Sequence, residues 1–384
     1  MPPTPEKSLV ESNTAFALDL YARLTQREGN LFLSPLSIGA ALAMAYVGAR
    51  GQTASQMARV LHFTLPQSEL HPAFGGLVAD LLTRAAKGGC QLQAANALWV
   101  QKGYPVIEEF LGTLRSSYGS APREADFQGA PEAAGHAINR WVEEATRGRI
   151  SEIVRARDLG PLTRLILANA VYFKGNWAAP FATDATRDAP FTLLTGERIP
   201  VPMMHREGDF HYAQGGGFQA IELPYAGSEL SLAVILPRKK DGLPALERSL
   251  AAPSLAEWLS RLRREHDVTV ELPRFTIAWH GVLRDALALL GMADAFRLPP
   301  ADLSGMTGKL GLFIGEVIHK TRIDVTEEGT EAAAATALTA PEAAPPGADE
   351  PLVFRADHPF LFLLRDRRSG SILFLGRLMD PKHS

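Results

Sequence analysis

One apolar run limits most strongly how this chain can fold. The residues from Leu165 to Phe173 form a long and mostly apolar stretch. A strand with one face open to water alternates apolar and polar residues, whereas this run is too continuous for an edge strand. The run therefore predicts a strand that is covered on both faces.

The order of the remaining elements indicates the fold class. Helical periodicity appears early, at residues 8–26 and 36–47, and Thr53 with Gln56 matches a capping box at the start of a third helix. A later helix is expected at Leu283–Leu290. The stretches with strand character are Gln219–Leu223, Ser231–Leu236, Val268–Ile277, Thr321–Val325, Phe360–Leu364 and Ile372–Leu375. Early helices and late strands, without a strict βαβ rhythm, predict a mixed α and β fold rather than a doubly wound sheet.

Composition narrows the class of protein. The chain has 384 residues, 46% of them hydrophobic, and a formal net charge of -3. Because no linker-like composition divides it, we expect one large domain. The near-neutral charge argues against a nucleic-acid partner. Three basic clusters, at residues 238–240, 261–264 and 365–368, lie beside turn residues or acids and are predicted to be solvated surface.

Cys90 is the only cysteine, so no disulfide can form within the chain. We expect it to be a small buried apolar residue rather than a nucleophile. The first residues lack the basic start and apolar run of a signal peptide, and no stretch has the length and apolarity needed to cross a bilayer. The expectation is a soluble protein with no membrane partner, either cytoplasmic or secreted after trimming.

The motifs of common enzymes are missing from the sequence. It contains no G-x-S-x-G elbow, no H-E-x-x-H zinc pair and no Walker-type phosphate loop. The glycines at 215–217 lack the context of a nucleotide site, and His205 and His211 are isolated, which favours turn or surface positions over metal ligation. We expect no enzyme activity, no catalytic residue, no cofactor and no metal.

The segment from Glu327 to Pro351 is the most informative about function. It is rich in alanine, glycine, proline and acidic residues, which cannot build a core of their own, so an exposed linker is one interpretation. Long irregular loops inside compact domains are uncommon, however, and are usually functional or disordered. Composition alone leaves both interpretations open.

Strand periodicity favours a functional loop. The small or apolar residues that would share one strand face are Thr330, Ala332, Ala334, Thr336 and Leu338. The only charge among these alternating positions, Glu331, would lie on the other face. Gly329 provides the backbone freedom of a hinge, and because proline is absent until Pro341, residues 328–340 can all donate their N–H groups to a ladder. Such a segment could slide between two strands.

Glu327 to Thr336 reads Glu-Glu-Gly-Thr-Glu-Ala-Ala-Ala-Ala-Thr and resembles the reactive-loop hinge of an inhibitory serpin. The similarity extends from about residue 8 to the end of the chain. Further segments that resemble serpin landmarks are Asn30–Ile38, Leu167–Trp177, Glu222–Tyr225, Leu290–Phe296, Ala301–Gly305, Ile318–Lys320 and Asp357–Phe362. The Arg-rich, Ala-, Gly- and Pro-rich composition hints at a prokaryotic source.

The resemblance implies an α+β serpin fold, with helices packed on three β-sheets, a single domain over residues 8–384 and an exposed reactive-centre loop at about 327–351. It implies that the loop, once cut, inserts into the main sheet between the strand ending at Phe173 and the strand from Thr321 to Glu327. The partner would be a serine protease, held in a covalent acyl-enzyme complex by a monomeric inhibitor.

The resemblance also assigns site residues. The hinge comprises Glu327, Glu328, Gly329, Thr330, Glu331, Ala332, Ala333, Ala334, Ala335 and Thr336. The shutter, a buried polar cluster over which the sheet opens, comprises Ser34, Ser37, Asn169 and His319. The breach, where the loop first enters, comprises Trp177, Arg274 and Glu327, with an ion pair between the last two.

Counting the usual seventeen residues of the family from Glu327 puts the reactive bond between Ala343 and Ala344, which suits an elastase- or subtilisin-like protease. The loop is longer than in many relatives, which leaves Leu338, Thr339, Ala340 and Glu342 as further positions, the last for an acid-directed protease. A non-inhibitory serpin, acting as chaperone, carrier or storage protein, is the alternative. Such members place bulky, charged or proline residues in the hinge, where this chain has only Glu331.

Overall fold

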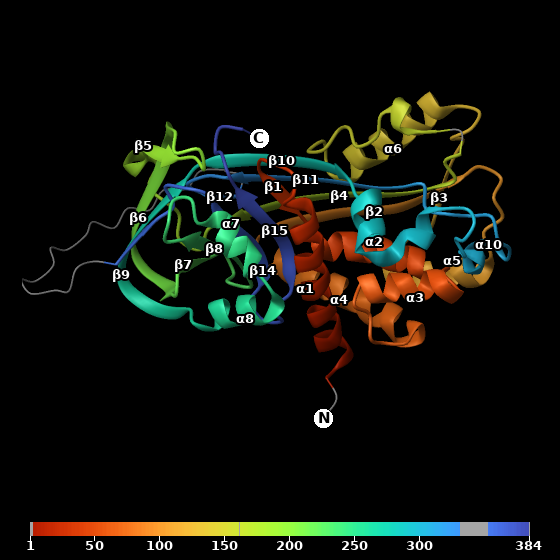
Figure 1. The fold of residues 1–384 in the computed structure, drawn as a ribbon, viewed down its shortest axis with the longest axis horizontal. Helices are drawn as coiled ribbons and strands as arrows, with labels where there is room; N and C mark the ends of the chain where they lie inside the picture. The colour runs from red at the N-terminus through yellow and green to blue at the C-terminus, as the bar shows by residue number, and fades with distance from the viewer. Residues whose placement is uncertain (1–2, 161, 331–351, 384) are drawn as a thin grey trace, which may run out of the picture.

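The computed structural model describes residues 3–160, 162–330 and 352–383. Most of the helices come from the first 150 residues and pack together at one end of an elongated molecule (Figure 1). The α-helices are α1 (Pro5–Leu24), α2 (Pro35–Tyr46), α3 (Gly51–Val60), α4 (Gln67–Lys87), α5 (Glu108–Tyr118), α6 (Pro131–Ala145), α7 (Leu243–Arg248), α8 (Ala252–Ser260), α9 (Arg284–Leu287) and α10 (Ser304–Thr307). Three short 3-10 helices lie at Ala156–Asp158, Thr183–Ala185 and Ala293–Phe296.

The smaller of the two sheets has six strands. In spatial order they are β10 (Phe275–Val282), β11 (Glu316–Val325), β12 (Gly329–Thr330), β4 (Leu165–Asn176), β2 (Gln91–Gln101) and β3 (Arg123–Ala125). β11 and β4 also pair directly, in parallel, over most of their length. The two-residue strand β12 lies between them only at one end of the sheet.

The larger sheet has nine strands. The main path runs β1 (Leu31–Leu33), β15 (Ile372–Leu378), β14 (Phe360–Asp366), β8 (Leu230–Pro237), β7 (Phe218–Pro224), β6 (Arg198–Gly215), β9 (Arg263–Pro273) and β13 (Val353–Arg355), and β5 (Arg187–Thr192) pairs with β6. The strands of the described residues thus form two sheets rather than the three expected. The reason is the 18-residue β6, which pairs with β5 near one end and with β7 near the other, so a third sheet is continuous with the second.

Both faces of β4 are covered, as its apolar run predicts. Leu167, Val171 and Phe173 point into the main core, which is shared with the α1–α5 helices. Ile166, Ala168 and Ala170 belong to a second core beneath α6, which crosses the opposite face of the sheet (Figure 1). Because both faces of the strand are covered and neither meets water, apolar and polar residues need not alternate along it.

Two expected local features differ in the structure. Helix α3 begins at Gly51 without a side-chain cap, because Thr53 Oγ1 accepts a hydrogen bond from the distant Asp302 N–H at 2.9 Å and Gln56 Oε1 accepts one from Asp294 N–H at 3.0 Å. The helix expected at 283–290 is α9 followed by a π-helical turn at Ala288–Met292, in which Gly291 adopts a φ of 124°.

Candidate functional site

A strand-sized opening lies between β4 and β11 at one end of the six-stranded sheet. The two strands pair in parallel from Ile166 opposite Glu316 to Tyr172 opposite Arg322. Beyond that point the chain returns from β11 and β12 occupies the opening, antiparallel to both neighbours. Thr330 is paired with Val325 on β11 and with Gly175 on β4. The first hinge residues are therefore already part of the sheet.

Thr330 is fully buried at this position. Its Oγ1 atom lies 2.8 Å from the hydroxyl oxygen of Tyr225, and burial raises the pKa of that hydroxyl, which stays neutral. The ring of Tyr225 stacks on that of Trp177 at a centroid distance of 4.7 Å. The side chain of Thr330 thus lies beside the Tyr225 hydroxyl and the stacked rings of Tyr225 and Trp177.

Gly329 is required by the close approach of β12 to β4. Its φ is 150°, in the range that favours glycine, and a Cβ atom at this position would lie 2.2 Å from the carbonyl oxygen of Gly175. No other residue could adopt this backbone without displacing one of the two strands.

The breach residues meet directly beside β12. Arg274 and Glu327 form the expected ion pair, and Thr186 donates a hydrogen bond to the same Glu327 carboxylate at 2.7 Å. Burial alone would raise the pKa of Glu327, but the hydrogen bonds from Arg274 and Thr186 outweigh it and hold the pKa below its usual value. Trp177 Nε1 donates to the carbonyl of Thr326 at 3.0 Å. These contacts fix the turn between β11 and β12.

The four shutter residues lie together where β4 and β11 are still paired. Asn169 and His319 are opposite each other across the two strands, and the Nδ1 atom of His319 is hydrogen-bonded to the Asn169 side chain. His319 Nε2 accepts from the Ser34 N–H at 3.0 Å, and Asn169 Nδ2 donates to Ser37 Oγ at 2.6 Å. The N-terminus of α2 is thereby joined to both strands.

Burial keeps His319 uncharged. The side chain is fully buried, and this burial lowers the pKa of the imidazole to about 3. A neutral ring can accept from the Ser34 N–H, whereas a protonated ring could not. The closed arrangement of the sheet therefore requires the neutral form of His319.

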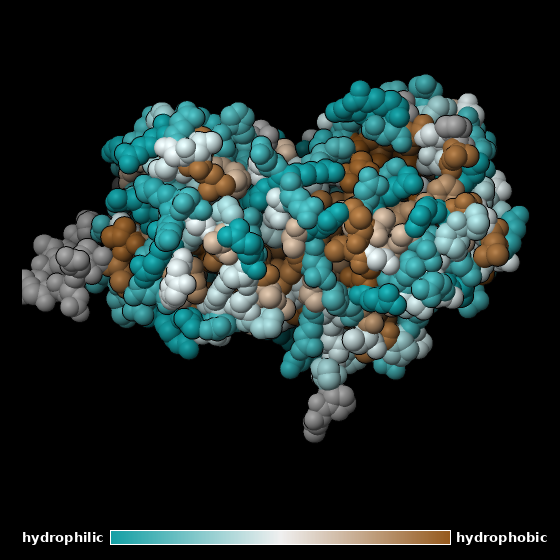
Figure 2. All heavy atoms as spheres, viewed as in Figure 1, coloured by the Kyte–Doolittle hydropathy of each residue, from teal (hydrophilic) through white to brown (hydrophobic). Residues whose placement is uncertain are grey.

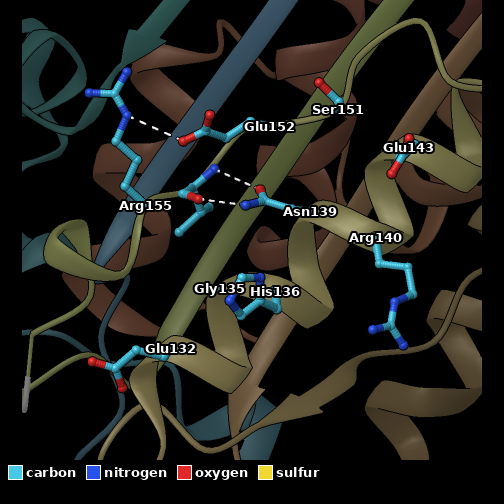
Figure 3. A pocket seen from close by; sticks show the side chains of 10 residues that line it. Glu132, Gly135, His136, Asn139, Arg140, Glu143, Ser151, Glu152 and Arg155 are labelled. Carbon is cyan, nitrogen blue, oxygen red and sulfur yellow. Dashed lines mark hydrogen bonds and ion pairs between the residues drawn. The ribbon is translucent and has the colours of Figure 1, made fainter.

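The segment after α6 covers the outer face of the same strands. Lys320 donates from β11 to the carbonyl of Glu152 at 2.5 Å, and His280 donates from β10 to that of Ile153 at 3.1 Å. Asn139 of α6 holds the segment from the other side, because its Nδ2 donates to the Val154 carbonyl at 2.7 Å and its Oδ1 accepts from the Val154 N–H at 3.0 Å (Figure 3). This cover spans the strands that would separate if the sheet opened.

The site contains residues that the sequence did not assign to it, although Thr321 and Tyr225 lie in segments named above. Asn96 on β2 accepts a 3.1 Å hydrogen bond from Ser37 Oγ, and Thr321 Oγ1 donates to the Phe32 carbonyl at 2.6 Å. Tyr225 and Thr186 complete the contacts around β12. Neither Asn96 nor Thr186 has a local sequence signal, because β2 also carries Gln91, Gln93 and Gln101 and Thr186 lies in a segment without a motif.

The remaining hinge residues, from Glu331 to Thr336, and the expected reactive bond between Ala343 and Ala344 lie outside the described residues. Within the described ranges, no cluster of side chains is suited to hold a metal ion. No described helix combines the length and apolarity that spanning a bilayer requires. Cys90 is a buried free thiol, and burial raises its pKa to about 11.

Comparison with known proteins identifies the family. A family model for serpins (serine protease inhibitors) matches residues 11–381. The chain is 46% identical to an uncharacterized serpin-like protein of Thermococcus kodakarensis, covering 98% of this chain and 87% of that one. It is 41% identical to human leukocyte elastase inhibitor, covering 98% of this chain and all of the other.

Comparison of structures agrees with this result. The crystal structure of human thyroxine-binding globulin superposes with a TM-score of 0.87, at 29% sequence identity, and covers 98% of this chain and 100% of that one. This similarity confirms the expected serpin fold. The family match over nearly the whole length leads to one conclusion: the chain belongs to the serpin family of serine protease inhibitors.

Proposed function

We propose that this serpin is a suicide-substrate inhibitor of serine proteases. The protease cuts the exposed loop, remains attached as an acyl-enzyme, and is carried along as the loop inserts into the six-stranded sheet. The observation that supports this most strongly is the position of β12, where Gly329 and Thr330 already occupy the start of a central strand between β4 and β11. In this proposal residues 8–384 act as one domain and as a monomer.

The register of β12 supports further insertion. If the strand continued without a shift, Thr336 would come to lie opposite both Asn169 on β4 and His319 on β11, six residues beyond the pairing of Thr330. A threonine hydroxyl between these two polar side chains could replace the hydrogen bond that they now share. The residues between are alanines apart from Glu331, so no large side chain would oppose the movement.

The energy released by insertion would be large enough for the task. About 15 to 25 new ladder hydrogen bonds, at roughly 0.5–1.5 kcal/mol net each, give on the order of 10–30 kcal/mol. Whole domains are stable by only ~5–15 kcal/mol, so this release could distort an attached protease. A strand of ~15 residues would also carry the enzyme ~50 Å.

We assign the reactive bond to Ala343 and Ala344 and the target to an elastase- or subtilisin-like protease with a shallow specificity pocket. The small residues around this bond support the assignment. So does the 41% identity to a relative whose name is leukocyte elastase inhibitor, although that name describes the relative's own target.

The experiment is to mix the intact protein with pancreatic elastase and with subtilisin and to resolve the products on a denaturing gel. We expect a complex that withstands SDS. We also expect a small C-terminal fragment, whose mass should show that its first residue is Ala344. Cleavage without any complex would contradict the proposal.

A non-inhibitory role is the second candidate, because the structural relatives include a hormone-binding globulin. The hinge argues against it, since the positions beyond Gly329 carry no bulky, charged or proline residue until Pro341 except Glu331. The same gel separates the two roles, because a non-inhibitory serpin would be cut as an ordinary substrate and release active enzyme.

A further inference from the structure

A hollow lies on the larger sheet at the Phe218 end of β7, whereas the contact with the hinge is made by Tyr225, just past the other end of that strand. It is formed by the turn between β6 and β7, the end of β8, and the helices α7 and α8, which lie beside that sheet (Figure 1). Its volume is about 670 Å³. Pockets of roughly 300–1,000 Å³ that bury most of a ligand are typical of small-molecule sites.

The floor of this hollow is apolar and aromatic. Phe218 of β7 and Trp258 of α8 line it, with their ring centroids 5.2 Å apart and their planes tilted by 42°. Pro237 and Leu246 extend the apolar lining. Both rings are largely buried in the core, so only a small part of each ring is exposed to the hollow. Packing in the core holds the two rings in fixed positions.

The rim of the hollow is positively charged. Arg238 and Lys239 follow β8, and Arg261 follows α8. These residues come from two of the basic clusters that the sequence predicts to be solvated surface, and the fold brings the clusters together at one opening. On the face shown in Figure 2, hydrophobic residues reach the surface in scattered areas between hydrophilic ones.

Only part of this positive charge is neutralised. Arg261 forms an ion pair with Glu257, the single acidic residue of the lining. Arg238 donates to the amide oxygen of Gln214 at 2.7 Å. Among the described residues no carboxylate lies within 4 Å of Arg238 or Lys239, so both cations can bind a ligand.

We propose that this hollow binds a small amphipathic anion, with an apolar body of fatty-acid size and one carboxylate or sulfate head. The apolar body would cover Phe218 and Trp258, and the head would receive charge-assisted hydrogen bonds from Arg238 and Lys239. Two uncompensated cations suit one anionic head, whereas a polyanion would require a longer basic track. The site is independent of the loop and of protease inhibition.

Isothermal titration calorimetry with dodecanoate, below its micelle concentration, tests the proposal. We expect saturable binding at one site per chain. Dodecan-1-ol, which has the same chain without the charge, and sodium sulfate, which has the charge without the chain, should each bind at least about tenfold more weakly. Equal binding of the alcohol, or binding only of a heparin fragment, would overturn the proposal.

Two variants locate the site. The double variant Arg238→Gln/Lys239→Gln removes the free cations, and Ala245→Trp places a large ring in the hollow from an exposed position on α7. Each should weaken dodecanoate binding about tenfold or more, whereas the matched surface variant Lys102→Gln/Lys309→Gln should not. Unfolding curves check that each variant folds. Undiminished binding by both pocket variants would rule out this hollow as the site.

Discussion

At the scale of single residues, His319 couples the closed sheet to pH. An ordinary histidine takes up a proton near pH 6.5, whereas burial lowers the pKa of His319 to about 3. Between these values the unfolded chain binds more protons than the folded one, so stability is complete above pH 6.5 and is lost as the pH falls. Burial also lowers the pKa of His71, to about 4, which acts in the same direction.

We therefore expect the intact protein to lose about 2 kcal/mol of stability through His319 alone between pH 6.5 and pH 5. Thermal midpoints measured across this range should fall with pH in the native chain and fall less steeply in His319→Gln. A variant of the exposed His136, His136→Gln, should keep the native slope. Parallel slopes in all three proteins would show that His319 does not carry the effect.

The sequence predicts which polar residues belong to the site, but it does not predict which of them contact one another. The four shutter residues are identifiable only through similarity to the family, because they come from three separate segments and no local pattern links them. They are Ser34, Ser37, Asn169 and His319. The structure brings them together. Asn96 completes the network but is missed, since a single amide in a strand gives no indication of which distant hydroxyl it will face.

At the scale of elements, the short strand β12 depends on Gly329. A Cβ atom there would lie 2.2 Å from the Gly175 carbonyl oxygen. Gly329→Ala should therefore displace β12, increase hydrogen exchange at Thr330 and reduce the fraction of protease trapped. Gly216→Ala, at a position where a Cβ meets no atom within 4 Å, should behave as the native chain. Unchanged exchange at Thr330 would contradict this account of the hinge.

Thr330 tests whether β12 must be buried for inhibition. Arginine at this fully buried position would place an unpaired charge between two strands, at a cost of several kcal/mol. Thr330→Arg should be cut at the loop but form at least about tenfold less SDS-stable complex. Thr330→Val keeps the shape and loses only the contact with Tyr225, at about 1 kcal/mol, so it should still trap protease. Equal trapping by both variants would mean that insertion does not begin here.

Prediction of helices and strands from the sequence succeeds where burial alone determines the pattern of residues. It fails where tertiary contacts compete with local hydrogen bonds. The apolar run of β4 predicts a strand covered on both faces, and the structure confirms it. The capping box at Thr53 and Gln56 is wrong, because both side chains bond to backbone N–H groups some 240 residues away in the chain, at Asp302 and Asp294. Long-range partners of this kind leave no trace in local spacing.

At the scale of the whole molecule, the fold holds two strands together that a third could separate. β4 and β11 are paired along the shutter and apart at β12, with α6 and its following segment across their outer face. The intact form would then be metastable, because the sheet gains a full central strand only after the loop is cut. The resemblance to the family already implies insertion between these two strands, and the structure adds the register of their pairing, from Ile166 opposite Glu316 to Tyr172 opposite Arg322.

The most direct measurement compares the thermal midpoint of the intact protein with that of the same protein after a protease has cut the loop near Ala343. Insertion of a strand worth on the order of 10–30 kcal/mol should raise the midpoint by more than about 10 °C. A midpoint that stays the same or falls after cleavage would show that the loop does not join the sheet and would contradict the proposed mechanism.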